Sequence, residues 1–232
     1  EGTMIASLVA EQEENRIAGL MLAGYAHENL YDVIKWQYSG ASSMLNLCPV
    51  FDSDGDGTIS REEYESEKKR PTAWREKVMQ GTGFAVLDKS KDGILSSEDF
   101  RITVEPMYKA VLAKYEAGDE DWLWKNYFRV SIPWLKEHFE LEPNKERLMR
   151  LDIPIFVFHG DRDANTDVNG VYDLKKRFEE AGKTRLKTFV FKDHDHQLKA
   201  VDWLRKGEMP EGYQKIYEVA EKLNKYFAKK AR

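Results

Sequence analysis

The pattern of apolar positions predicts strands that alternate with helices at the two ends of the chain. Residues 3–10 form a small apolar run without the alternation of a surface strand, which predicts a buried helix. Continuous apolar runs at 17–23, 153–158 and 188–191 are typical of parallel strands covered on both faces. Helical patterns separate the last two runs and close the chain. Strands that alternate with helices in this way indicate an α/β layer.

A middle segment of different character, residues 26–150, separates the first predicted strand from the second. It is rich in charged residues and helical patterns, and clusters of Asp and Gly interrupt it. We interpret it as an inserted helical subdomain, and we assign residues 1–25 and 151–232 to the α/β core. The aromatic run from Trp122 to Trp134 lies in this insertion, and a core role is favoured over a substrate-lining role for it.

The composition fits a soluble globular protein and excludes several classes of function. The 232 residues carry 36 basic and 41 acidic side chains, which gives a formal net charge of −5, and 41% of them are hydrophobic. This mildly acidic balance gives no electrostatic footprint for nucleic acid. No stretch approaches the roughly 18 to 20 apolar residues that a membrane span requires. The single cysteine, Cys48, excludes an internal disulfide and a cysteine-based zinc site.

The strongest chemical signal is an acidic loop at residues 52–63. Twelve-residue calcium loops place oxygen ligands at positions 1, 3, 5, 7, 9 and 12, with glycine at position 6 for a sharp turn. Gly57 occupies position 6 in this loop. The six ligand positions hold Asp52, Asp54, Asp56, the Thr58 carbonyl, Ser60 and Glu63. Because Ca²⁺ takes six to eight oxygen ligands, acidic residues at alternate positions suit it, and the loop resembles an EF-hand. Ile59 supplies the apolar residue through which two such loops pair across a short strand.

A second loop, residues 88–99, follows the same spacing with two departures. Its ligand positions hold Asp88, Ser90, Asp92, the Ile94 carbonyl and Asp99, with Gly93 at position 6. Asp99 replaces the usual glutamate of position 12, and its shorter side chain reaches an ion less easily in the bidentate mode. Lys89 and Lys91 further reduce the negative charge of the loop. We therefore expect two Ca²⁺ sites, the second weaker and tolerant of Mg²⁺; a structural mimic that binds no ion is the alternative for the second loop.

The two later strands lead into motifs that carry a candidate acid and a candidate histidine. The strand at 155–158 runs into His-Gly-Asp-Arg-Asp, which ends at Asp163. This apolar strand followed by His-Gly-x-x-Asp resembles the segment of serine α/β-hydrolases that carries the catalytic acid. The resemblance implies that Asp163 is that acid, and that His196, followed by Gln-Leu after the last strand, is the catalytic histidine. Asp161 and His194 are the alternatives for the two roles.

The start of the sequence resembles the second half of the nucleophile elbow of the same family, G-x-S-x-G. In that match Glu1 follows the nucleophile and Gly2 is the closing glycine. The resemblance implies that the serine immediately precedes Glu1, and that the backbone N–H of Glu1 is an oxyanion donor. It also implies an upstream half of the same hydrolase with its first five strands. Since the sequence shows neither an initial methionine nor a targeting signal, we expect that a leader has been removed or that more of the protein lies upstream.

These features predict an α/β-hydrolase fold, doubly wound and mostly parallel, with an all-α EF-hand subdomain inserted where this family commonly carries a lid. The expected function is that of a calcium-binding serine hydrolase, which cleaves an ester or related acyl bond of a small-molecule substrate through a Ser-Asp-His triad. Thioesterase and peptidase activities stay open because a fold does not fix a substrate. An aspartate before Glu1 would instead indicate a dehalogenase or epoxide hydrolase.

The alternative is a non-catalytic, calcium-responsive binding module on a hydrolase scaffold. In either case we expect calcium to order the inserted subdomain, because crowded carboxylates repel one another until an ion binds. Imperfect calcium loops fill most readily at the millimolar calcium found outside cells, which favours an extracellular or periplasmic protein.

Overall fold

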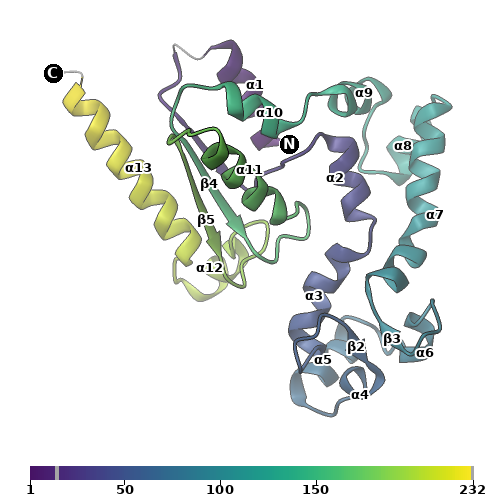
Figure 1. The fold of residues 1–232 in the computed structure, drawn as a ribbon. Coiled ribbons are helices and arrows are strands. Elements are labelled where there is room, and N and C mark those ends of the chain that lie inside the picture. The colour runs from purple at the N-terminus through teal and green to yellow at the C-terminus, as the bar shows by residue number, and fades with distance from the viewer. Residues whose placement is uncertain (14–15, 231–232) are drawn as a thin grey trace. The chain divides into compact units, whose positions relative to one another are not determined.

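The computed structural model describes residues 1–13 and 16–230, with side chains described through residue 225. The chain divides into two compact units (Figure 1). Unit 1 joins Glu1–Asn29 to Glu142–Arg232, and unit 2 is the continuous segment Leu30–Leu141.

Unit 1 is a mixed α/β structure. Its elements are α1 (Gly2–Gln12), β1 (Leu20–Ala23), α10 (Asn144–Arg150), β4 (Ile155–Gly160), α11 (Asn169–Glu180), β5 (Leu186–Phe191), α12 (Ala200–Lys206) and α13 (Glu211–Lys230). The strands form a parallel sheet in the order β1-β4-β5, with Leu20 opposite Ile155 and Ile155 opposite Leu186. The expected α/β class is therefore confirmed in its coarse form, as a small parallel sheet with helices.

The first strand is shorter than the apolar run 17–23 predicts. The Leu20 N–H donates to the Pro154 carbonyl at 2.8 Å, but Pro154 itself has no N–H with which to extend the ladder. Gly19 passes so close that a Cβ there would lie 2.9 Å from the Pro154 oxygen. The chain therefore approaches β4 as irregular backbone, and pairing begins at Leu20.

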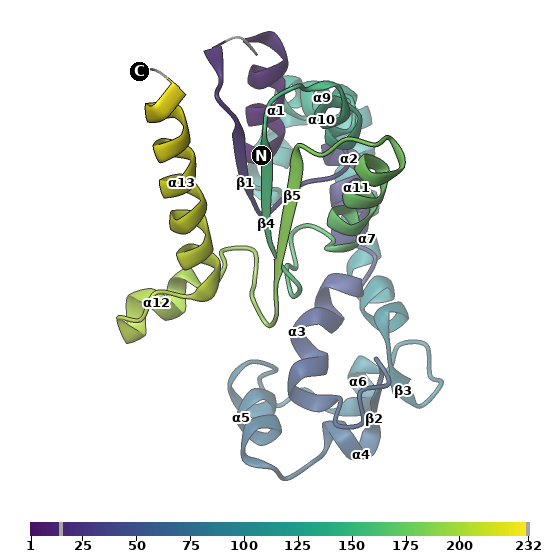
Figure 2. The same cartoon turned by 60° about the vertical axis from the view of Figure 1, so that its left-hand side comes forward.

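Alternate residues of the strands supply two apolar faces. One face, which includes Leu22, Ile155 and Val157, packs against residues of α1, α10 and α11. The opposite face, which includes Phe158 and Phe191, packs against α13. Figure 2 shows α11 on one side of the sheet and α13 on the other. Because both faces are covered, the strands read as continuous apolar runs.

Unit 2 is built almost entirely from helices. Its elements are α2 (Leu30–Gln37), α3 (Ala41–Phe51), β2 (Ile59–Ser60), α4 (Arg61–Tyr64), α5 (Lys69–Lys77), α6 (Phe84–Leu87), β3 (Ile94–Leu95), α7 (Ser97–Glu116), α8 (Glu120–Asn126) and α9 (Ile132–Glu140). The short strands β2 and β3 are antiparallel, with Ile59 opposite Leu95, both fully buried. The expected pairing of the two loops through Ile59 is therefore present.

The aromatic run of unit 2 divides between core and surface. Leu123 and Tyr127 are buried in a cluster with Ile34, Val111 and Leu135, and Trp122 and Trp134 pack against that cluster. Trp124 and Phe128, by contrast, are 54% and 84% exposed. The core role that the sequence favours therefore describes part of the run.

The chain enters and leaves unit 2 at neighbouring places. Tyr31 in the first turn of α2 contacts Phe139 near the end of α9, with ring centroids 5.5 Å apart in an edge-to-face arrangement. Such aromatic pairs are worth about 0.5–1.5 kcal/mol beyond the area that they bury. This contact fastens the two ends of the unit to each other.

Candidate functional site

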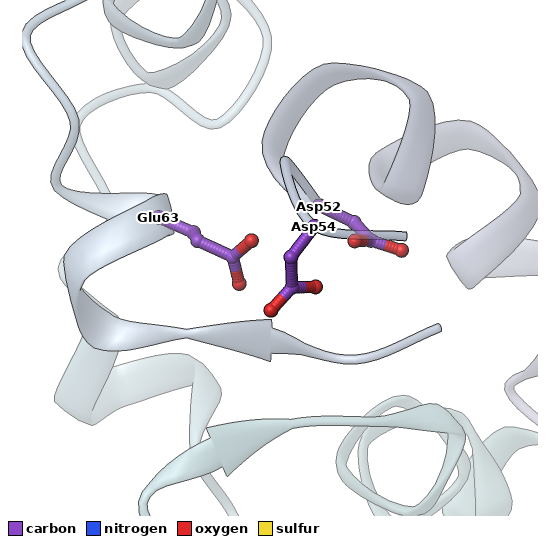
Figure 3. Close-up of side chains that lie close together, drawn as sticks. All are labelled: Asp52, Asp54 and Glu63. Atoms are coloured by element: carbon purple, nitrogen blue, oxygen red, sulfur yellow. The ribbon is translucent and has the colours of Figure 1, made fainter. Parts of the chain in front are cut away.

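Loop 52–63 brings acidic side chains together at the end of α3. Ligand oxygens of Asp52, Asp54 and Glu63 lie within 4.8 Å of one another. Figure 3 shows their carboxylates gathered at the loop. Among the residues that the structure describes, no other group of three acidic, histidine or cysteine side chains has such a spacing. It is a suitable set of oxygen ligands for a hard divalent cation.

Hydrogen bonds inside the loop hold these carboxylates in place. Gly57, whose φ of 87° is in the left-handed region, donates its N–H to Asp52 Oδ2 at 3.0 Å. Glu63 Oε1 accepts from the Ser53 N–H at 2.7 Å, and Glu63 Oε2 accepts from the Ser60 N–H at 2.9 Å. Burial alone would raise the pKa of Glu63, but these hydrogen bonds outweigh it and lower the pKa to about 2. The carboxylate is therefore ionised and ready for a cation.

The remaining expected ligands of this loop bind neighbours within it. Asp56 Oδ1 accepts from the Thr58 N–H at 2.7 Å and from the Thr58 hydroxyl at 2.8 Å, which turns that carboxylate towards Thr58. The Ser60 hydroxyl donates to Glu63 Oε2 at 3.0 Å and accepts from the Glu63 N–H at 3.3 Å, the second of these bonds being part of the capping box that begins α4. Asp56 thus lies outside the group that Asp52, Asp54 and Glu63 form, whereas the Ser60 hydroxyl contacts that group through Glu63.

Loop 88–99 repeats the internal hydrogen bonds of the first loop at equivalent positions. Asp88 Oδ2 accepts from the Gly93 N–H at 3.2 Å, as Asp52 does from Gly57. Asp92 Oδ1 accepts from the Ile94 N–H at 3.1 Å, and Asp99 Oδ2 accepts from the Ser96 N–H at 2.8 Å. The second loop therefore shares the backbone turn and the orientation of these carboxylates with the first loop.

The second loop differs at its last position. Asp99 is fully buried, and its Oδ1 accepts from the Ser90 N–H at 2.9 Å, one residue further along the loop than the contact that Glu63 makes. In the described part of the chain, Asp88, Asp92 and Asp99 do not form a group of three with the spacing of the first loop. Whether this loop binds an ion stays a prediction.

The loops after β4 and β5 bring Asp163 and His196 together in unit 1. The two parallel strands end at the same edge of the sheet, where α/β proteins build their sites. His196 Nδ1 lies 2.8 Å from Asp163 Oδ2. Asp163 is buried, whereas the His196 side chain is 36% exposed. Because Nδ1–H donates to the carboxylate, the lone pair of a neutral imidazole lies on Nε2, as a general base requires.

Backbone contacts hold these two loops against each other. A Cβ at Gly160 would lie 2.1 Å from the His194 carbonyl oxygen, so only glycine permits the approach. The Arg162 N–H donates to the same oxygen at 3.0 Å. Asp161 Oδ1 accepts from the Asp193 N–H at 2.6 Å, which gives this alternative acid a structural partner.

The alternative histidine, His194, is also directed elsewhere. Its side chain is buried, and its Nδ1 lies 2.8 Å from the Lys192 carbonyl oxygen, to which it donates. The structure thus pairs Asp163 with His196 and does not bring Asp161 and His194 together as a side-chain pair.

A dense set of donors surrounds the Asp163 carboxylate. Oδ1 accepts from the backbone N–H groups of Asn165 and Thr166 at 2.8 and 3.0 Å, and Oδ2 accepts from the Thr166 hydroxyl at 2.9 Å. Burial alone would raise the pKa of Asp163, but the hydrogen bond from His196 and these donors hold the pKa below its usual value. The carboxylate is therefore charged at neutral pH and can orient His196.

The first turn of α1 reaches the same edge of the sheet. Thr3 Oγ1 accepts from the Ala26 N–H at 3.2 Å, and the Asn144 amide donates to the carbonyl oxygens of Thr3 and Ala26 at 3.2 and 2.9 Å. Gly24, which precedes Ala26 by two residues, packs against the His196 ring. Sequence reasoning missed these residues, although a Gly directly after an apolar run was a usable signal at position 24. Glu1, at the start of this turn, accepts from the Met4 N–H through its carbonyl at 2.9 Å.

Comparison with known proteins identifies one part of the chain. Residues 50–66 match the EF hand family, which covers loop 52–63 and α4. No curated protein and no solved structure matches the chain. The EF-hand match confirms the expectation of a loop that binds a divalent cation such as Ca²⁺. Among the residues that the structure describes, no helix combines the length and the apolar character needed to cross a membrane.

Proposed function

We propose that this protein is a calcium-binding serine hydrolase of the α/β-hydrolase type, which cleaves an ester or related acyl bond of a small-molecule substrate. The observation that carries the proposal is the 2.8 Å contact between Asp163 Oδ2 and His196 Nδ1 beyond the ends of parallel strands. The order of acid and histidine along the chain is the order of that family. The EF hand at residues 50–66 supplies the calcium site.

In the proposed mechanism, a serine hydroxyl attacks the acyl carbon while Nε2 of His196 accepts the hydroxyl proton. Asp163 keeps the proton of the neutral imidazole on Nδ1 and stabilises the imidazolium that forms. The bond between the acyl carbon and the leaving group breaks as His196 returns the proton to the leaving group. Water, which His196 deprotonates in turn, then cleaves the acyl-serine and restores the serine hydroxyl. General-base catalysis of this kind contributes on the order of 10²- to 10⁴-fold in rate.

The nucleophile in this proposal is the residue before Glu1 in the complete protein. The position of the first turn of α1 supports this assignment, because Thr3 contacts Ala26 and Gly24 packs against the His196 ring. The backbone N–H of Glu1 would then donate to the oxyanion, a contact worth on the order of 3 kcal/mol in such sites.

An upstream half of the same hydrolase completes the proposal. Among the described residues, β1 pairs with β4 along one edge and no strand pairs with its other edge. An unpaired edge of a parallel sheet exposes backbone donors and acceptors that another strand satisfies. One of the first five strands of the hydrolase would pair there, and the others would extend the sheet.

The experiment is to treat the purified protein, with the residues that the proposal places before Glu1, with a fluorophosphonate probe and to measure its intact mass. We expect one adduct on the wild type, and labelling slower by about 10²- to 10⁴-fold for His196→Asn and Asp163→Asn. Asp195→Asn is the matched control, since Asp195 lies in the same loop, is exposed, and binds the backbone of Gln197 and Lys199. It should label at the wild-type rate.

A protein that takes up no probe would contradict the hydrolase proposal. The calcium loop would then be the main functional site, in a non-catalytic, calcium-responsive binding module. Loss of labelling in His194→Asn together with normal labelling in His196→Asn would assign the base to the other histidine.

A further inference from the structure

A buried histidine that the proposed mechanism does not use lies next to Asp163, the residue that binds His196. His159, near the end of β4, is fully buried. The backbone N–H of Tyr25 points at its Nδ1 from 3.1 Å. Because a backbone N–H only donates, Nδ1 accepts, and the ring proton is on Nε2. The hydrogen bond from Tyr25 therefore fixes the tautomer of this ring.

The protonated nitrogen of His159 faces the Asp163 loop. His159 Nε2 lies 3.2 Å from the Thr166 carbonyl oxygen and 3.4 Å from Asp163 Oδ2. Thr166 in turn donates its N–H and its hydroxyl to the Asp163 carboxylate. One ring thus supports both the carboxylate and the loop residue that holds it. Burial lowers the pKa of His159, which keeps the ring neutral and its single proton on Nε2.

The other partner of His159 belongs to the segment against which His196 packs. Tyr25 follows Gly24, whose φ is +65°. A Cβ built on Gly24 would lie 2.5 Å from Cε1 and 2.8 Å from Nδ1 of His196. The Gly24 backbone therefore contacts the His196 ring, which Asp163 binds. A displacement of Tyr25 would displace that ring.

We propose that His159 is a positioning residue that joins the backbone of Tyr25 to the 163–166 loop, and so holds Asp163 and the His196 ring in one arrangement. Its effect on the dyad is independent of any reaction, whereas its effect on rate rests on the proposed function. Hydrogen-bonded support of this kind keeps catalytic groups within the small tolerance that proton transfer requires.

The test is nitrogen NMR of the imidazole rings, which reports which nitrogen of His196 carries the proton. We expect the wild type at neutral pH to hold the proton on Nδ1. His159→Phe fills a similar volume without either hydrogen bond, and we expect it to lose this preference. Gln can accept from Tyr25 through its oxygen and donate to Thr166 through its nitrogen, so His159→Gln should restore the preference.

A half-buried histidine elsewhere in unit 1, His27, provides the control. His27 Nε2 lies 3.0 Å from Asp173 Oδ2, and the Tyr25 hydroxyl donates to its Nδ1 at 3.2 Å, but it does not touch Asp163. His27→Phe should lower the melting temperature as His159→Phe does, yet leave the His196 tautomer unchanged. If general destabilisation caused the effect, the His196 tautomer would change in both variants, and this result would overturn the proposal.

Two further outcomes are decisive. An unchanged His196 tautomer in a folded His159→Phe variant would overturn the positioning role. If that variant does not fold, His159→Asn replaces it, because the shorter amide cannot span both partners. Equal tautomer populations in the Asn and Gln variants would then count against the proposal.

The rate of fluorophosphonate labelling separates this inference from the function on which it rests. We expect His159→Phe to label about 10²-fold more slowly than the wild type, as small misplacements of catalytic groups do. A wild type that shows the expected tautomers but no labelling would refute the hydrolase and keep the positioning role. If the wild type is labelled, and His159→Phe is labelled at the same rate and keeps the His196 tautomer, the hydrolase would stand and the positioning role would be refuted.

Discussion

A Cβ built on Gly40 would lie 1.9 Å from the carbonyl oxygen of Ser97. Gly40 directly precedes α3, and Ser97 is the first residue of α7, which begins inside the second loop. The helix that leads into loop 52–63 is therefore packed, without a side chain between, on the helix that leads out of loop 88–99. This contact joins the start of α3 to the start of α7.

We expect Gly40→Ala to destabilise unit 2 by about 1–3 kcal/mol more than Gly118→Ala does. Both glycines have a positive φ, 84° and 69°, so both substitutions carry the cost of a left-handed alanine. A Cβ on Gly118 meets nothing within 4 Å, which makes it the control for that cost. Trp203 is the only tryptophan of unit 1, so urea unfolding followed by tryptophan fluorescence reports mainly on unit 2. Equal midpoints for the two variants would show that α7 yields to the added methyl group.

The core beneath the loops should be sensitive to truncation at Ile59. This side chain is fully buried and packs in a cluster with Phe51, Tyr64 and Leu95. Ile59→Ala should cost about 2–5 kcal/mol because it removes buried methyl groups and leaves a cavity. Val86→Ala is the control, since Val86 is 56% exposed and surface changes usually stay within about 0.5 kcal/mol. Chemical denaturation measures both, and a loss below 1 kcal/mol for Ile59→Ala would contradict this account of the core.

Removal of calcium should lower the melting temperature of unit 2. A ligand that binds only the native state, at a free concentration 100 times its dissociation constant, stabilises that state by about 2.7 kcal/mol. Chelation of the calcium removes this contribution. Calorimetric scans with and without chelator measure the change. An unchanged melting temperature after complete chelation would show that loop 52–63 does not depend on the ion for its order.

Matched substitutions at position 1 of each loop count the calcium sites. Asp52→Asn should abolish the tighter binding event in a calcium titration, because Asp52 belongs to the acidic group of the first loop. Asp88→Asn should remove the weaker event and leave the tighter one. A titration of Asp88→Asn identical to that of the wild type would assign loop 88–99 the role of a structural mimic.

The stability of unit 1 should depend on the ionisation of Asp163. The pKa of this carboxyl is lower in the folded protein than its usual 3.8, so its charge favours the folded state above that pH. The contribution is lost as the pH falls through the folded pKa. The stability difference between the wild type and Asp163→Asn should therefore narrow below about pH 4. Thr166→Val, which removes one donor to Oδ2, should show an intermediate dependence in thermal melts across this range. A difference that is constant with pH would contradict the lowered pKa.

The parts of the fold that follow from local pattern were predictable from the sequence. The runs that became β4 and β5 are apolar on both faces because helices cover both, and the loop 52–63 has its ligands at fixed spacing. The pairing of Asp163 with His196 was implied by the resemblance to serine α/β-hydrolases, and in the structure the two residues follow parallel strands that end at one edge of the sheet. In each case neighbours along the chain, or one rule of sheet topology, determine the outcome.

Contacts between distant segments were not predictable. The role of Gly160 depends on the His194 carbonyl, and the orientation of His159 depends on a single N–H at Tyr25. The start of β1 at Leu20 depends on Pro154, far along the chain. Nothing in the local sequence of these residues encodes the partner, so periodicity and propensity carry no information about them.

The edge-to-face contact between Tyr31 and Phe139 keeps the two ends of unit 2 close together, as in domains that tolerate insertion into another chain. A segment whose two ends are fastened together can be gained, lost or exchanged for another without changing the gap that the flanking chain must bridge. Substitutions and insertions between Tyr31 and Phe139 therefore leave the two chain ends of unit 2 at the same separation.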